Sequence, residues 1–131
     1  MSRNRIQEGR GANQRQLRVG EVIRRHLSEV LSRGEIHDPD LNRIPITVGD
    51  VRLSGDLKVA TVYVVPLGGK NQDEMFELLK RNKGELRRSI ARGLSLKFTP
   101  ELRFRLDDTF DQLDENRRLF SQDAVRRDLE S

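Results

Sequence analysis

"SIARGLSLKFTPELRF", residues 89–104, joins a helical pattern to a strand pattern and so decides the order of elements in the fold. Its first half carries a basic helical pattern up to Gly93. Residues 101–106 then alternate apolar and charged side chains, which is typical of a strand with one buried face. Glycine inside a helix costs about 1 kcal/mol relative to alanine. We therefore expect a kink or break at Gly84 or Gly93, and we favour Gly93.

A long helical pattern precedes this junction and runs from about Gln72 to about Leu96. Apolar residues recur on one side of it and arginines on the opposite side, so one face is expected to pack against a sheet while the other faces outward. The apolar positions are Phe76, Leu79, Leu86, Ile90 and Leu94.

Two strand patterns further upstream predict a hairpin. Apolar residues alternate in 44–53, and the alternation slips by one residue at Gly49 and Asp50, which indicates a β-bulge. Residues 54–56 are typical of a turn, and 57–65 are rich in the β-branched residues that favour a second strand. The positions expected on one face of that strand are Ala60, Val62 and Val64.

The first helix is expected to begin at Gln14, because the side chain of Asn13 can cap it, and to end at Gly34. Its apolar positions at helical spacing are Ile23, Leu27, Val30 and Leu31. Residues 34–45 are rich in Asp, Asn and Pro and predict a loop.

Together these patterns predict one α+β domain over residues 14–109, in the order helix, strand, strand, helix, kinked helix, strand. We expect a three-stranded sheet with the helices packed on one face. A length of 131 residues suits one such domain with two tails. Residues 1–13 are basic and nearly devoid of apolar side chains, which predicts disorder, and 110–131 predict an acidic tail that is partly helical or flexible.

Charge is distributed unevenly along the chain, although the net charge is only +4. Residues 1–33 hold eight arginines and three glutamates, and residues 70–105 hold ten basic and five acidic residues. Residues 106–131 instead hold four basic and eight acidic residues. Two basic segments suggest a surface for a polyanion, whereas the simpler interpretation is solvated helix surfaces.

Enzyme chemistry has little support in the sequence. The chain lacks cysteine and a P-loop motif, and no nucleophile, base and stabiliser can be assembled from its residues. His37 lies near Asp38 and Asp40, but one histidine and two carboxylates in a loop usually form a turn rather than a metal site. Asp107 and Asp108 would point to opposite faces of a strand. We predict no enzymatic activity, no cofactor and no metal.

No apolar stretch is long enough to span a membrane, and the N-terminus lacks the apolar run of a secretory signal. The absence of cysteine is compatible with a reducing compartment. We therefore expect a cytoplasmic, monomeric protein without a membrane partner.

RNA binding has better support, because long cationic side chains cluster around one helix and its expected break. Arginine and lysine reach phosphates, and few aromatic residues are present to stack on bases, which favours a structured RNA. Ala91 and Gly93 form the expected kink; Gly93 would either let a phosphate approach or only permit the turn. Lys83 is the weakest candidate, since its helical angle falls among apolar positions. The candidate RNA-binding residues are Arg15, Arg18, Arg25, Lys80, Arg81, Lys83, Arg87, Arg88, Arg92 and Lys97.

The order αββααβ resembles a type II KH domain of the bacterial kind. The usual Gly-x-x-Gly is missing, and Ala91-Arg92-Gly93 stands in its place as an Ala-x-Gly kink. With "RQLRVGEVIRRHLSEVL", "SGDLKVATVYV" and "LRRSIARGLSLKFTPELRFRLDDT", residues 14–109 closely resemble the ribosome-binding factor A family.

This resemblance implies a factor for ribosome biogenesis. Members of that family bind the free, immature small ribosomal subunit and promote maturation of its rRNA, including processing of the 5′ end, and they are associated with growth in the cold. The residues by themselves support a compact domain that binds structured RNA. Two alternatives remain: a general KH-like RNA-binding protein, and a basic module that docks an acidic protein.

Overall fold

The computed structural model describes residues 13–109, so both expected tails lie outside the described residues apart from Asn13. The predicted domain boundaries therefore stay a prediction. The elements in chain order are α2 (Gln14–Ser32), α3 (Pro39–Asn42), β1 (Ile46–Leu53), β2 (Val59–Pro66), the short 3₁₀ helix η1 (Leu67–Gly69), α4 (Gln72–Arg81), α5 (Lys83–Gly93) and β3 (Glu101–Leu106). Among these helices, none is both long and apolar enough to cross a lipid bilayer.

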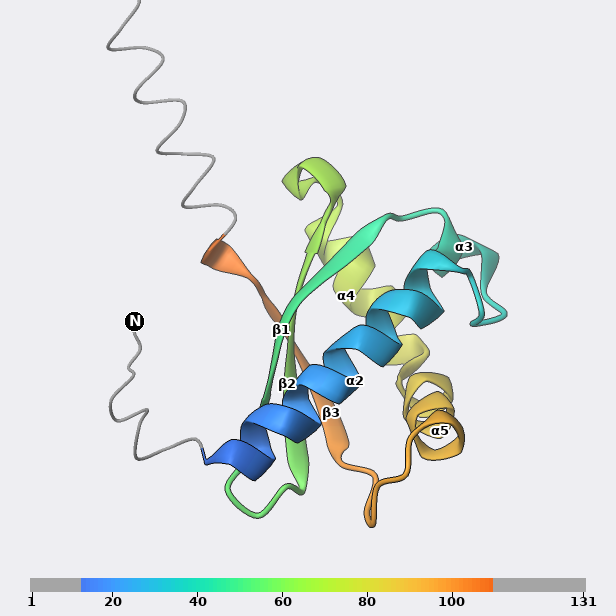
Figure 1. The fold of residues 1–131 in the computed structure, drawn as a ribbon. Coiled ribbons are helices and arrows are strands. Elements are labelled where there is room, and N and C mark those ends of the chain that lie inside the picture. Colours follow the sequence, from blue (N-terminus) through green and yellow to red (C-terminus); the bar gives the residue numbers. More distant parts are fainter. Residues whose placement is uncertain (1–12, 110–131) are drawn as a thin grey trace, which may run out of the picture.

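The three strands form one sheet in the order β1-β2-β3, with β2 in the middle. β1 and β2 pair antiparallel as a hairpin, and β3 returns to pair parallel with β2 after the chain has passed through α4 and α5. The long helices α2, α4 and α5 lie on the same side of this sheet (Figure 1). The structure thus confirms the predicted α+β architecture with helices on one face.

The predicted β-bulge in β1 is present. Val48 is the register partner of Val64, but the next paired residue of β1 is Asp50, opposite Tyr63, so Gly49 is the extra residue. The shift returns the apolar residue Val51 to the helical side of the sheet, where it is buried. Without it, the two halves of β1 would present their apolar residues to opposite faces.

The core lies between the sheet and the helical layer. Ala60, Val62 and Val64 of β2, which were predicted to share one face of the strand, are fully buried. Burying a side chain of the size of Leu or Ile contributes roughly 1.5–3 kcal/mol. The fully buried partners from the helices and β3 include Ile23, Met75, Leu79, Leu86, Ile90 and Leu102.

Helix α2 begins where the sequence predicts, because Asn13 and Gln16 cap it reciprocally. The Asn13 side chain accepts a hydrogen bond from the backbone N–H of Gln16 at 2.8 Å, and the Gln16 side chain accepts one from the N–H of Asn13 at 2.8 Å. Gln16 also donates to the carbonyl of Leu53 at 3.0 Å. A Cβ on Gly20 would lie 2.5 Å from the Val51 oxygen, so glycine lets α2 pack directly against β1.

The expected kink does not lie inside the helix at Gly93, the favoured position, but two residues before Gly84, the other expected position. The long helical pattern breaks at Asn82, between α4 and α5, and α5 then runs without interruption through Ala91 and ends at Gly93. The physical reason is the buried Asn82 side chain, whose Nδ2 donates to the carbonyl of Leu78 at 2.8 Å and to Asp38 Oδ2 at 2.7 Å. A contact made 44 residues away along the chain overrides the local preference for a glycine.

The expected loop over residues 34–45 contains a short helix that the sequence patterns did not predict. Asp38 caps α3 by accepting a hydrogen bond from the backbone N–H of Asp40 at 3.2 Å, and Pro39 occupies its first turn. Leu41 is buried in the core, which holds the segment against the helical layer. α3 therefore brings Asp38 to the break between α4 and α5.

Candidate nucleic-acid interface

Arg81, one of the predicted RNA-binding residues, forms an ion pair with Asp38 at the break between α4 and α5. Its Nη2 lies 2.7 Å from Asp38 Oδ2 and its Nε lies 3.1 Å from the same oxygen. The hydrogen bond from Asn82 and the contacts from Arg81 lower the pKa of Asp38 to about 2, so its carboxylate is ionised at neutral pH. Arg81 therefore joins α4 to α3.

Arg87 binds backbone carbonyl groups instead of a carboxylate. Its Nε donates to the carbonyl of Pro100 at 3.1 Å, and its Nη2 donates to the carbonyl of Thr99 at 2.8 Å. These two bonds tie α5 to the loop that precedes β3. Arg87 is an exposed residue, and these bonds hold its guanidinium against the loop.

Two further predicted cations pair with a glutamate on their own helix. Arg88 Nη2 lies 2.6 Å from Glu85 Oε1, and this pair lowers the pKa of Glu85. Arg25 Nε lies 2.9 Å from Glu21 Oε2, and hydrogen bonds from Arg24 and then Arg25 lower the pKa of Glu21 to about 2. Exposed pairs of this kind are weak and can open when a phosphate approaches.

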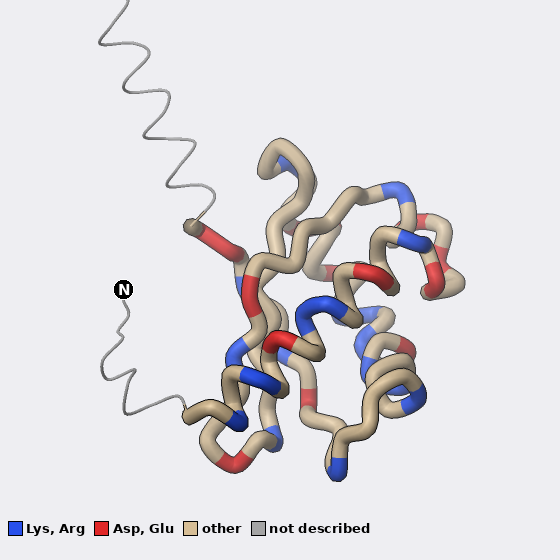
Figure 2. The backbone as a smooth tube through the Cα atoms, in the orientation of Figure 1, with Lys and Arg blue, Asp and Glu red and all other residues tan. Residues whose placement is uncertain are grey.

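The other predicted cations form no ion pair or side-chain hydrogen bond with another residue of the described range 13–109. All are exposed except Lys83, which is half-buried. Basic positions recur along α2, along α5 and in the loop after α5, while acidic positions gather around α3 (Figure 2). The cations in this group are Arg15, Arg18, Lys80, Lys83, Arg92 and Lys97.

Gly93 has a packing role that its place in the sequence did not reveal. A Cβ at this position would lie 2.5 Å from Cε1 of His26, whose Nε2 lies 2.7 Å from the Ser89 hydroxyl oxygen. Glycine therefore makes room for the imidazole of α2 beside the last turn of α5. Ala91 is an exposed residue of the same turn.

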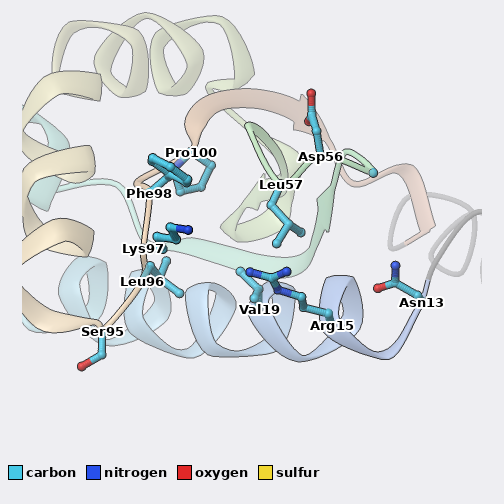
Figure 3. A pocket seen from close by; sticks show the side chains of 11 residues that line it. Asn13, Arg15, Val19, Asp56, Leu57, Ser95, Leu96, Lys97, Phe98 and Pro100 are labelled. Atoms are coloured by element: carbon cyan, nitrogen blue, oxygen red, sulfur yellow. The ribbon is translucent and has the colours of Figure 1, made fainter.

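A cleft of about 610 Å³ lies between the start of α2, the turn between β1 and β2, and the loop between α5 and β3 (Figure 3). It brings together two of the predicted cations, Arg15 and Lys97, which are far apart in the sequence. Phe98 lines the same cleft and was not predicted. The signal that could have identified it is a lone aromatic residue between a lysine and a Thr-Pro turn in a polar segment.

The open face of the sheet carries a second group of cations. Arg103 and Arg105 of β3 are exposed there, and Arg52 of β1 lies over the Tyr63 ring at 5.2 Å from its centroid. Arg52 also lies 2.9 Å from Asp50. This face was not among the predicted contact surfaces.

The acidic residues that could suggest metal binding have other partners. Asp38 and Asp40 both accept hydrogen bonds from Arg81, and Asp40 also pairs with Arg43. Within the described part of the chain, no group of three or more histidine or acidic side chains is arranged to hold a metal ion. The buried Asp107 carboxylate accepts a hydrogen bond from the backbone N–H of Thr109 at 3.2 Å.

Known proteins match both the sequence and the fold. The family model of ribosome-binding factor A matches residues 15–120. Ribosome-binding factor A of Ruegeria pomeroyi is 68% identical over 130 residues, which cover 99% of each chain. The crystal structure of ribosome-binding factor A from Thermus thermophilus is 28% identical, with a TM-score of 0.60 over 70% of this chain and 94% of that one.

A second structural match comes from a ribosomal complex. It is a homology model of the Thermus thermophilus ribosome-binding factor A fitted into a cryo-EM map of a 30S complex of that protein. It is 28% identical, with a TM-score of 0.56, and covers 68% of this chain and 91% of that chain. The match to the family model over most of the chain, together with the full-length relative, shows that this chain belongs to the ribosome-binding factor A family.

Proposed function

We propose that this protein binds the free, immature small ribosomal subunit through its rRNA and promotes late maturation of that subunit. The observation that carries the proposal is the 30S complex of a family member with the same fold. The exposed cations of α2, α5 and the following loop support RNA as the ligand, since each can reach a phosphate oxygen. The protein acts in the cytoplasm, where the subunits mature.

The proposed interface centres on the cations that have no partner among residues 13–109. Arg15 and Arg18 extend it from α2, and Arg92 and Lys97 extend it from α5 and the loop after it. Lys80 and Lys83 belong to the same group, and Arg25, Arg87 and Arg88, which have partners in the fold, complete the interface. Arg81 contributes by holding α3 against the helix break.

The mechanism is binding rather than catalysis. A protein that binds one conformation of the rRNA more tightly than another shifts the population toward it by the difference in affinity. The layer of α2 and α5 over the sheet (Figure 1) carries basic residues (Figure 2) that would make such a selection. Processing of the 5′ end of the rRNA would follow from the conformation that is held, and the demand would be greatest in the cold, where misfolded RNA rearranges slowly.

Sedimentation of a cell extract tests this function. In sucrose gradients at low and high magnesium, the protein should migrate with free small subunits and be absent from translating ribosomes. Cells without it should accumulate small-subunit rRNA with an extended 5′ end, measured by primer extension, and more so in the cold. Migration at the top of the gradient at low salt would contradict the proposal and favour a general RNA-binding or protein-docking role.

A further inference from the structure

The cleft beside the start of α2 combines two kinds of group that nucleic-acid ligands require. Arg15 enters from the first turn of α2 and Lys97 from the loop between α5 and β3, and both side chains extend into the cleft (Figure 3). Neither forms an ion pair with a residue of the described range. Two unpaired cations that converge from separate elements favour a bound anion such as a phosphate.

Phe98 supplies the second kind of group. Its side chain is 69% exposed, although phenylalanine is usually buried. Lys97 Nζ lies 5.6 Å from the centroid of the ring, so a cation already lies beside the aromatic surface. An exposed ring with adjacent cations is the arrangement on which unpaired bases stack in single-stranded nucleic-acid sites.

The walls of the cleft suit a sugar and a base. Val19, Leu57 and Leu96 line it with apolar, half-buried side chains. Leu57 has a φ of +63°, a left-handed conformation that bulky residues rarely adopt, and it lies in the turn between β1 and β2, where its N–H donates to the Ser54 carbonyl at 2.9 Å. A volume of about 610 Å³ lies within the range of pockets that hold small-molecule ligands.

One acidic residue, Asp56, also lines the cleft but does not oppose an anion there. Its carboxylate accepts hydrogen bonds from the Ser54 hydroxyl at 2.7 Å and from the backbone N–H of Lys58 at 3.0 Å. Figure 3 shows that this carboxylate points away from Arg15 and Lys97. The turn between β1 and β2 therefore uses Asp56 for its own structure.

We propose that this cleft is a subsite for a single unpaired nucleotide of the bound RNA. The base stacks on Phe98, the sugar packs against the apolar wall, and the adjacent phosphate binds Arg15 and Lys97. This inference rests on the proposed function and adds to it a local feature that the protein recognises in the RNA, a base extruded from a helix. It also explains why a chain with few aromatic residues exposes one beside Lys97, in a cleft that Arg15 also lines.

A small RNA tests the subsite without a ribosome. The probes are a hairpin with one bulged adenosine and the same hairpin fully paired, titrated with the full-length chain. The wild type should bind the bulged hairpin more tightly, and Phe98→Ala and Phe98→Leu should each weaken that binding about 5- to 100-fold, the usual range for loss of one stacked base. Phe98→Tyr should retain the preference, because its ring still stacks.

The choice of variants separates stacking from other effects. Phe98 is exposed, so the variants should keep the wild-type circular dichroism spectrum. Leu67→Ala is the matched control, because Leu67 is 73% exposed and lies on η1, outside the cleft; it should leave binding unchanged. If Phe98→Leu retained the preference, or if the wild type had none, the stacking subsite would be wrong. Arg15→Ala and Lys97→Ala should each reduce the salt dependence of binding by about one unit of slope.

A photocrosslink tests the same contact on the subunit. The full-length chain with p-benzoylphenylalanine at position 98, or at 67 as the control, is bound to free small subunits and irradiated. Position 98 should crosslink to rRNA at one unpaired nucleotide and position 67 should not. A crosslink from position 98 to ribosomal protein alone would overturn the subsite and indicate a protein occupant. If the chain sediments with small subunits but fails both tests, the subsite is wrong while the proposed function stands; if it does not sediment with them, the proposed function fails by its own measurement.

Discussion

The polar and charged residues at the two ends of α5 differ in their partners. At the N-terminal end, Asn82 and Arg81 direct their polar groups to Asp38, and the cluster holds three helices together. At the C-terminal end, Gly93 packs on His26, and the loop that follows presents Lys97 and an exposed aromatic ring to solvent. Cations at one end serve the fold, and cations at the other are available to a ligand.

The difference shows why a count of basic residues does not define an interface. Arg81 and Arg92 have the same chemistry and lie on the same run of helices. Arg81 pairs with Asp38, the cap of α3, and with Asp40 of α3, whereas Arg92 has no acidic partner in the described range. The two arginines differ because α3 and its cap place two carboxylates beside Arg81. Three substitutions test the contrast, and their expected effects decrease in size.

The largest effect is expected at the break. Asn82→Ala should lower the free energy of unfolding by about 1–3 kcal/mol, because the buried carbonyl of Leu78 and the carboxylate of Asp38 each lose a donor. Urea denaturation followed by circular dichroism measures the change. The neighbouring Lys83→Ala should change it by no more than about 0.5 kcal/mol. Equal effects at the two positions would show that the cluster does not hold the break.

An intermediate effect is expected at Gly93. Gly93→Ala should cost about 1 kcal/mol, because crowding against His26 outweighs the gain in helix propensity. In a His26→Ala background the same change should be neutral or stabilising, as should Gly84→Ala, where the added methyl would make only an ordinary contact with Arg88 Nη2 at 3.9 Å. A double-mutant cycle on thermal unfolding measures the coupling. Identical costs in both backgrounds would exclude the imidazole as the cause.

The smallest effect on stability is expected at Arg92. Substitution of this residue should instead change RNA binding. Arg92→Ala should leave the free energy of unfolding unchanged and reduce the slope of log affinity against log salt by about one unit for small-subunit rRNA. Arg81→Ala should do the reverse, with lower stability and an unchanged slope for the folded protein. Filter binding over a range of salt concentrations gives both slopes. A lower slope of log affinity against log salt with Arg81→Ala would show that Arg81 contacts the RNA.

Local rules were sufficient to predict most of the fold from the sequence. The cap at Asn13, the slip at Gly49 and the alternation of β2 and β3 each follow from interactions between near neighbours or from burial of one face. The break between α4 and α5 could not be predicted in this way. The low helix propensity of glycine is a local signal, whereas the break at Asn82 depends on the carboxylate of Asp38, the cap of α3. The composition of the segment that contains α3 is typical of a loop, so the sequence did not predict this helix.

The candidate site was predictable in its composition but not in its arrangement. Charge segregation pointed to α2 and to the region of α5, and all ten predicted cations lie in the described range. The sequence could not show that Arg15 and Lys97 share a cleft, because their distance depends on how α2 crosses the end of the sheet. It could not show the exposure of Phe98 either, since a single aromatic residue in a loop has no periodic pattern.

The parallel pairing of β2 with β3 has a consequence for how the protein is made. β1 and β2 can form a hairpin as soon as they leave the ribosome, but the sheet then has a free edge along its central strand. That edge is covered only when Leu102 and its neighbours emerge, after α4 and α5 have crossed over. Until then, Val62 lacks its partner Phe104 and the core lacks Leu102. The protein therefore cannot complete its sheet until residue 106 has left the ribosome that synthesises the chain.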